Sequence, residues 1–163
     1  MRISWNDYKV QAGVDLESDG AFIYRGQRST SWGLTSTLHR TAIVQSIPEL
    51  KTYADFMLPT VHDAIEAWVG RSWKLDDRLG LAEFLAYLQH NGFPTPLLDW
   101  SASPYIAAYF AFEGVNHFSP QTEDVAIFSF NQRLWKNKYK QVYDFADFTP
   151  HVSVLRPRLA GNH

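Results

Sequence analysis

The spacing of apolar and polar positions along the chain predicts short strands mixed with amphipathic helices. Short apolar runs bounded by turn residues predict strands, and apolar residues recurring every three or four positions predict helices. The predicted strands are residues 21–26, 95–100, 125–131 and 152–155. The predicted helices are residues 46–58, 60–69, 81–90 and 104–114, with a polar helix or turn at 132–141 and a surface loop at 70–80. The pattern therefore indicates an α+β fold with a small central sheet flanked by helices.

Capping residues mark several of the helix boundaries. Ser46 and Glu49 have the spacing of a capping box at the start of one helix. Pro59 is expected to stop or kink that helix, because proline lacks the amide hydrogen that continues the helical ladder. Ser103 followed by Pro104 is typical of an N-cap with proline in the first helical position.

Composition and charge narrow the classes of function. The 163 residues fit a single domain, and we expect one domain over residues 1–163. A formal net charge of −2 without any basic run disfavours duplex nucleic acid and membrane surfaces as partners. The chain has no cysteine, no apolar leader and no long apolar run, which favours a cytoplasmic protein. The aromatic share of 15%, with six tryptophans, requires either a core or a stacking surface for these rings.

The first candidate for chemistry is the junction Arg25, Gly26 and Gln27, where the apolar run of the first predicted strand ends. A guanidinium at this point suits a bidentate grip on phosphate or carboxylate, and Gly26 allows a ligand or a backbone to approach closely. The alternative is a structural arginine that pairs with a carboxylate. Asp99 would be the partner.

The second candidate is the junction "LLDWSASPYIAAYF", residues 97–110. Asp99 follows a predicted strand, Trp100 offers a stacking face, and Ser101 and Ser103 precede a helix whose N-terminus can hold an anion. The alternative is that Ser103 only caps the helix while Trp100 packs and Asp99 binds a turn.

The remaining polar residues favour no site. His90 at a helix end is better placed to interact with the helix dipole than to act as a base. The six histidines lack metal-ligand spacing, so no metal is expected. Hydroxyls at 29–31 have no evident base, and "HRT" and "KNKYK" are typical of solvated surface.

Two motifs read together resemble the FRG domain family. The aromatic-Arg-Gly motif of that family stands here as Tyr24-Arg25-Gly26. Its second signature resembles "QHNGFPTPLLDWSASPYIAAYFAF", residues 89–112, except that Pro96 stands where the family usually has arginine. The likeness extends from about residue 1 to the end of the chain. The missing arginine removes one positive charge from the second junction.

The resemblance implies a layout similar to that of the ADP-ribosyltransferase superfamily, with NAD as substrate. On that analogy Arg25 and Asp99 are the candidate catalytic residues. The expected dinucleotide contacts come from both junctions: Tyr24, Arg25, Gly26, Gln27, Trp100, Ser101, Ser103 and Tyr105. The implied activity is ADP-ribosyl transfer or NAD glycohydrolysis, in a toxin or phage-defence effector.

Three hypotheses follow from the resemblance. The first is a NAD-binding enzyme part, expected to lack the C-terminal segment that brings the catalytic glutamate or glutamine. The second is a non-catalytic ligand- or protein-binding module with a structural Arg25–Asp99 pair. In the third, another chain or a cleaved C-terminal segment of the same chain completes the fold.

Overall fold

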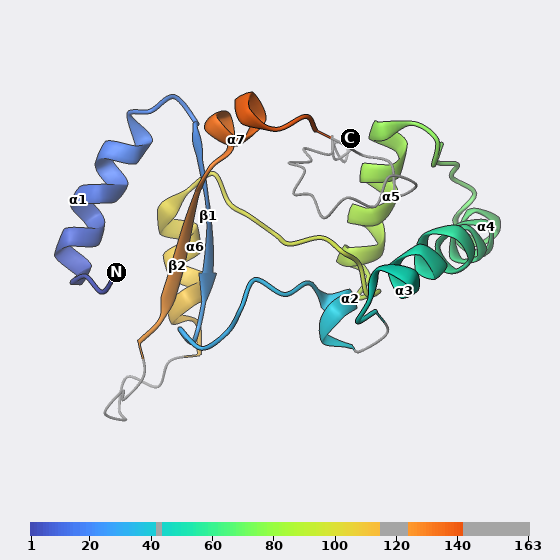
Figure 1. Ribbon diagram of the computed structural model, residues 1–163, viewed down its shortest axis with the longest axis horizontal. Helices are drawn as coiled ribbons and strands as arrows, with labels where there is room; N and C mark the ends of the chain where they lie inside the picture. Colours follow the sequence, from blue (N-terminus) through green and yellow to red (C-terminus); the bar gives the residue numbers. More distant parts are fainter. Residues whose placement is uncertain (42–43, 115–123, 142–163) are drawn as a thin grey trace. The chain divides into compact units, whose positions relative to one another are not determined.

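The computed structural model describes residues 1–41, 44–114 and 124–141, and these residues divide into two compact units. The first unit combines residues 1–34 with 99–140, and the second is built on residues 35–98. The first unit combines elements that lie far apart in the sequence, and the two units are described separately (Figure 1). Within the described residues, helices and strands together confirm the predicted α+β class.

The first unit contains an antiparallel strand pair with helices around it. Strand β1 (Phe22–Gln27) pairs with β2 (Ala126–Asn131) in a register that sets Arg25 opposite Phe128. Helix α6 (Pro104–Phe112) packs along this pair, as Figure 1 shows. Helices α1 (Trp5–Leu16) and α7 (Gln132–Lys138) complete the unit. The described part of the sheet therefore has two strands, and α6 covers one of its faces.

The second unit is helical in its described part. Helices α2 (Thr37–Arg40), α3 (Ile47–Thr52), α4 (Leu58–Val69) and α5 (Arg78–His90) surround its apolar core. The largest buried side chains of this core come from every helix except α3 and from the segments between them: Leu38, Val44, Tyr53, Leu58, Trp73, Phe84, Leu85 and Leu88.

The helix around Pro59 does not stop where the sequence suggests. A single π-helical turn, η1 (Tyr53–Met57), joins α3 directly to α4, and Pro59 lies in the first turn of α4. A π turn widens the helix by one residue, and such turns are a recognised way for the backbone to accommodate a break in the ladder. Of the two outcomes expected at Pro59, a stop or a kink, the stop does not occur, and the helical ladder is distorted by the π turn directly before α4.

The strand predicted at residues 95–100 is absent from the described structure. This segment runs irregularly, and only Ser101 forms an isolated antiparallel bridge, with Tyr24. Prolines at positions 94 and 96 remove two amide donors from any ladder. Leu97 instead packs against the core of the second unit. The strand predicted at 152–155 lies outside the described residues.

The other predicted elements are confirmed with small shifts. Helix α5 begins three residues earlier than expected, because the Asp77 carboxylate caps the amides of Leu79 and Gly80. Ser103 caps α6 as predicted, with its hydroxyl accepting from the amide of Ile106. Across the described ranges, no helix is long and apolar enough to cross a membrane.

Candidate functional site

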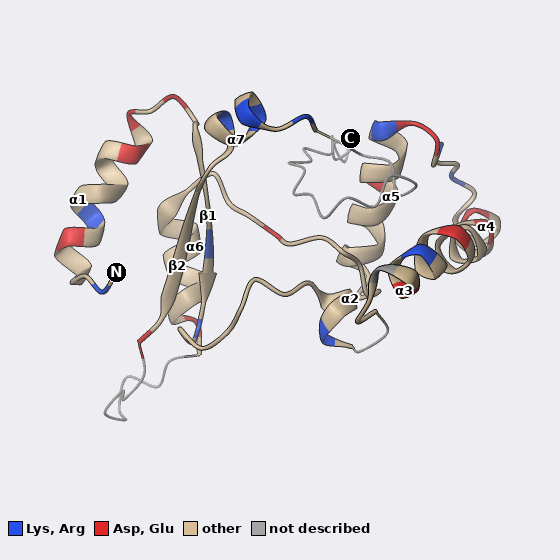
Figure 2. Cartoon of the chain, in the orientation of Figure 1, with Lys and Arg blue, Asp and Glu red and all other residues tan. Residues whose placement is uncertain are grey.

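Alternation of side chains along β1 and β2 gives the strand pair two chemically different faces. The face toward α6, here called the helix face, carries Phe22, Tyr24 and Gly26 with Ile127, Ser129 and Asn131. The opposite face, here called the arginine face, carries Ile23, Arg25 and Gln27 with Ala126, Phe128 and Phe130. Arg25 is the single charged residue of the two strands, and the blue position on β1 in Figure 2 marks it. Apart from Gln27, the other residues of this face are apolar.

Gly26 has a structural role on the helix face. A Cβ atom added there would lie 1.9 Å from the carbonyl oxygen of Ala107 and 2.7 Å from the amide nitrogen of Ala111. Both atoms belong to the backbone of α6, so the helix axis approaches the strand more closely than any side chain permits. Of the two uses considered for Gly26, the structure shows the close approach of a backbone.

Tyr24 is buried and is tied to α1. Its hydroxyl donates to the Asp15 carboxylate at 3.1 Å, and the Gln11 amide donates to the same carboxylate at 2.8 Å. Burial, followed by the nearby Asp15 charge, raises the pKa of Tyr24 above its usual range. The phenol therefore stays neutral and works as an anchor between β1 and α1. It is 2% exposed, so a ligand could contact little of its ring.

The two sequence junctions meet at the outer edge of β1. The amide of Tyr24 donates to the Ser101 carbonyl, and the amide of Ser101 donates to the Tyr24 carbonyl, both at 2.7 Å. One residue further along, Nη1 of Arg25 donates to the backbone carbonyl oxygen of Asp99 at 2.7 Å. The guanidinium and the 99–103 bend are thus in direct contact.

Arg25 and Asp99 meet through the backbone of Asp99 in this bond, which orients the guanidinium without using the carboxylate. Asp99 is exposed and Arg25 is partly exposed. Whether the two side chains also form the charge pair suggested by the sequence stays a prediction. The planar fork of the guanidinium carries five N–H donors, and this bond uses one nitrogen of the fork.

The hydroxyls of the bend serve the start of α6. Ser101 Oγ accepts from the amide of Ser103 at 3.0 Å, and Ser103 Oγ accepts from the amide of Ile106 at 3.4 Å. The amide of Ala107 already binds the Ser103 carbonyl, and Pro104 has no amide hydrogen. Few first-turn amides remain for an anion. The capping interpretation of Ser103 is therefore observed, and the helix N-terminus offers little to a phosphate.

Aromatic rings form a chain that includes the arginine face. Trp100 contacts Phe130 at 5.8 Å between ring centroids, and Phe130 contacts Trp135 at 5.5 Å. Trp135 in turn contacts Tyr139 at 4.2 Å. Phe130 lies on the arginine face, two positions along β2 from Phe128, which pairs with Arg25. Trp100 thus packs against another ring, as the alternative interpretation of the second junction predicted, and this ring, Phe130, belongs to the arginine face.

Tyr105 and Gln27 lie in different surroundings. Tyr105 is 47% exposed on α6 and lies close enough to Tyr8 to contribute, after burial, to raising the pKa of Tyr8 to about 12. It therefore belongs to the side of the sheet that carries α6 and α1, and the structure does not bring it to Arg25. Gln27 is 7% exposed at the end of β1, on the arginine face. Its Nε2 donates to the Gly33 carbonyl at 3.2 Å.

The first half of the second signature is structural. Thr95 is fully buried, and its hydroxyl donates to the side-chain oxygen of Gln89. The Thr95 carbonyl accepts from the amide of Leu38 at 3.1 Å, and the Pro94 carbonyl accepts from the Tyr53 hydroxyl at 3.2 Å. These bonds fix the turn after α5 within the second unit. His90 is exposed in the last turn of α5, where the sequence placed it.

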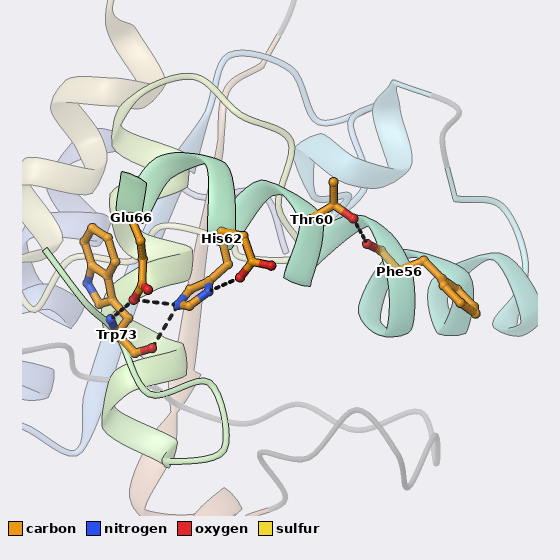
Figure 3. Close-up of polar contacts among 6 residues, drawn as sticks. Phe56, Thr60, His62, Glu66 and Trp73 are labelled. Carbon is orange, nitrogen blue, oxygen red and sulfur yellow. Dashed lines mark hydrogen bonds and ion pairs between the residues drawn. The ribbon is translucent and has the colours of Figure 1, made fainter. Parts of the chain in front are cut away.

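A polar cluster around His62 in the second unit was not predicted from the sequence (Figure 3). His62 Nε2 lies 3.0 Å from Glu66 Oε1 and 2.8 Å from the Trp73 carbonyl, and its ring packs edge-on against Phe84. The Glu66 carboxylate also accepts from the Trp73 amide at 2.7 Å. The i, i+4 spacing of His62 and Glu66 was the available signal. The cluster ties α4 to the segment before α5, which is a structural role.

Bonds from Ser72 and from the Trp73 amide, together with the nearby His62, hold the pKa of Glu66 below its usual value. The carboxylate is therefore ionised at neutral pH and is engaged by Ser72, Trp73 and His62. Among residues 1–41, 44–114 and 124–141, no cluster of histidine, aspartate and glutamate has the make-up of a metal site.

Comparison with known proteins gives the chain its family. The model of the FRG domain matches residues 20–120, which include both junctions and the second signature. Searches of curated proteins and of solved structures each returned no match. The match covers more than half of the chain and carries the motifs that the structure brings into contact, and the protein therefore belongs to the FRG domain family.

Proposed function

We propose that the arginine face binds NAD or a closely related dinucleotide, with the phosphates held by Arg25. The observation that carries the proposal is the partly exposed Arg25, whose guanidinium is oriented by the Asp99 carbonyl on a strand face that also carries Phe128 and Phe130. Dinucleotide sites combine a cation for the pyrophosphate with flat apolar surface for the rings. The arginine face has both within one strand pair.

Each part of the site has a defined task in this proposal. Arg25 supplies the positive charge and the planar guanidinium fork for the pyrophosphate. Trp100, packed on Phe130 of the arginine face, would give a ring surface for stacking. Asp99, exposed beside Arg25, is the carboxylate nearest to the bound ligand. Tyr24 and Gly26 act indirectly, because they fix β1 against α1 and α6.

The chemistry that we propose is ADP-ribosyl transfer or NAD glycohydrolysis, as in a toxin or defence effector. Breaking the bond to nicotinamide builds positive charge on the ribose, and a nearby carboxylate stabilises that charge. Asp99 is the carboxylate that the described site offers for this role. Arg25 would keep the phosphates in place while the ribose reacts.

Calorimetric titration tests the binding step. Wild-type protein, Arg25→Ala and Arg28→Ala are each titrated with NAD. Arg28 lies three residues away and pairs with Glu113 at 3.8 Å, so it provides a charge-matched control. Loss of a charged hydrogen bond costs about 1.5 to 3 kcal/mol, so Arg25→Ala should weaken binding roughly ten- to hundredfold. Arg28→Ala should bind as wild type. No saturable heat with wild type, or equal affinity for both variants, would overturn the proposal.

The bond from Arg25 to the Asp99 carbonyl favours a second candidate, a non-catalytic binding module in which Arg25 is structural. In that case Arg25→Ala lowers the free energy of unfolding by about 1.5 to 3 kcal/mol, the range for a lost hydrogen bond from a charged group, because Asp99 is exposed and no buried charge is left unpaired. Urea unfolding of the same variants separates the two functions. Lost NAD binding with an unchanged urea midpoint supports the dinucleotide site, and a large fall in the midpoint supports the module.

A further inference from the structure

Gln27 has an unmet hydrogen-bond acceptor on the arginine face. The side chain is more than nine-tenths buried, and its Nε2 is fixed by the Gly33 carbonyl at 3.2 Å. Its Oε1 is shielded from solvent and finds no hydrogen-bond partner within the part of the chain that the structure describes. Buried polar atoms in folded proteins nearly always have partners, so each exception asks for a specific explanation.

Rotating the amide does not solve the problem. Exchange of Oε1 and Nε2 would set the amide oxygen against the Gly33 carbonyl, which is also an acceptor. The amide orientation is therefore determined by Gly33, and Oε1 has to face away from it. The missing partner must be a donor.

The place of Gln27 relates this acceptor to the proposed ligand. Gln27 follows Arg25 by two positions on the same face, a separation of about 7 Å along a strand. Two acceptors, Gln27 Oε1 and the Gly33 carbonyl, therefore lie next to one strong cation. A complementary ligand carries an anionic group for Arg25 and an N–H donor about 7 Å away for Gln27.

We infer that Gln27 recognises the carboxamide of the nicotinamide ring, with Oε1 accepting from the carboxamide N–H. This inference rests on the proposed NAD site and names the residue that makes the site specific for the amide form of the ring. The carboxamide supplies the donor that Gln27 lacks. A carboxylate in its place brings only acceptors to Gln27 and Gly33, so the site discriminates between the amide and the acid.

Oε1 is shielded from solvent in the ligand-free chain, so binding of the carboxamide needs a local displacement, and this proposal assigns it to the loop of residues 28–34. Two of the backbone bonds of this loop are long. The amide of Thr30 binds the Asp124 carbonyl at 3.3 Å, and the amide of Trp32 binds the Ser29 carbonyl at 3.4 Å. The Gln27–Gly33 bond joins the same loop to β1.

The test compares three ligands on wild-type protein by calorimetry: NAD, its nicotinic acid analogue and ADP-ribose. We expect NAD to bind at least tenfold more tightly than the nicotinic acid analogue. The nicotinic acid analogue carries an additional carboxylate, which the positive charge of Arg25 would favour. A preference for NAD would therefore have to come from a group other than Arg25. ADP-ribose reports the affinity of the phosphate site alone. Wild-type protein is sufficient, so the test does not depend on the folding of a variant.

A variant then assigns the discrimination to Gln27. Gln27→Met keeps the length of the side chain and removes its amide, and it should reduce the preference for NAD over the acid to less than about threefold while ADP-ribose binds as before. Equal binding of all three ligands to wild type overturns the role of Gln27 and leaves the dinucleotide site intact. Unchanged discrimination in Gln27→Met also overturns it. If none of the three ligands binds, both the proposed function and this inference are wrong.

Discussion

The glycine of the FRG motif should tolerate no side chain, and the structure gives the size of the effect. In Gly26→Ala the new Cβ would lie 1.9 Å from the Ala107 carbonyl oxygen, whereas ordinary contact begins at about 3.4 Å. Helix α6 would have to retreat from β1 by at least about 1.5 Å, the difference between these two distances. The neighbouring atoms belong to backbone on both sides, so no side-chain rotation relieves the clash.

The retreat also weakens contacts beyond Gly26. The bridge between Tyr24 and Ser101 lies just before α6, and the two hydrogen bonds of 2.7 Å depend on the position of this helix. Overpacking of a well-filled interior costs about 1 to 3 kcal/mol when side chains can adjust, and more when backbone must move. We therefore expect Gly26→Ala to lower the free energy of unfolding by about 3 kcal/mol or more, a large share of the roughly 5 to 15 kcal/mol typical of a domain.

Urea unfolding followed by circular dichroism measures this loss, and Gly13→Ala is the matched control. Gly13 lies in α1 with no atom within 4 Å of an added Cβ. Alanine there should stabilise the protein by about 0.5 to 1 kcal/mol through helix propensity. If Gly26→Ala unfolds within about 0.5 kcal/mol of wild type, the close packing of α6 on β1 is refuted. The glycine would then have to be explained by the ligand.

Three further predictions concern other parts of the two units. Tyr24→Phe should cost about 1 to 2 kcal/mol in urea unfolding, because the buried Asp15 carboxylate loses one of its two donors; an unchanged midpoint would contradict the anchoring role. The lowered pKa of Glu66 stabilises the fold above the unfolded-state pKa, and this contribution is lost as the pH falls through the folded-state pKa. Between neutral and acid pH, wild type should therefore lose more stability than Glu66→Gln, as measured from urea midpoints, because the variant has no carboxylate to titrate at this position; equal losses in both proteins would argue against this cluster. Burial raises the pKa of Tyr53 to about 12, so its neutral phenol contributes fully below pH 10 and the contribution disappears as the pH rises towards 12; Tyr53→Phe should reduce the alkaline loss of stability measured from urea midpoints at pH 8 and pH 11, and an equal loss in both proteins would contradict it.

The helices could be predicted from the sequence where local capping determines them. Ser103 with Pro104 and the Asn91-Gly92 pair mark boundaries that the structure confirms. Helix α1 was missed although Ser4 and Asp7 form a capping box at its start. Ala12 and Asp15 are its buried residues, so its apolar periodicity is weak. Here the cap was a better signal than the hydrophobic pattern.

Tertiary contacts decided what local pattern could not. The apolar run at residues 97 and 98 suggested a strand, but Leu97 belongs to the core of the second unit. Strand β1 continues past its apolar part to Gln27 because β2 offers Ile127 and Ala126 as partners. Nothing in the sequence shows that α6 lies against Gly26. The contact of Arg25 with Asp99 was expected as a pairing of charges, and the observed bond to the backbone carbonyl could not be deduced without coordinates.

Chemical-shift mapping during a NAD titration tests the central claim most directly. In ¹⁵N-labelled wild-type protein, we expect saturable shifts at the Arg25 side chain, the Trp100 indole N–H and the amides of residues 99–101. The outer face of α6, where Tyr109 is 63% exposed, should not respond. Shifts confined to that face or to the His62 cluster, or the absence of any saturable shift, would contradict a dinucleotide site on the arginine face.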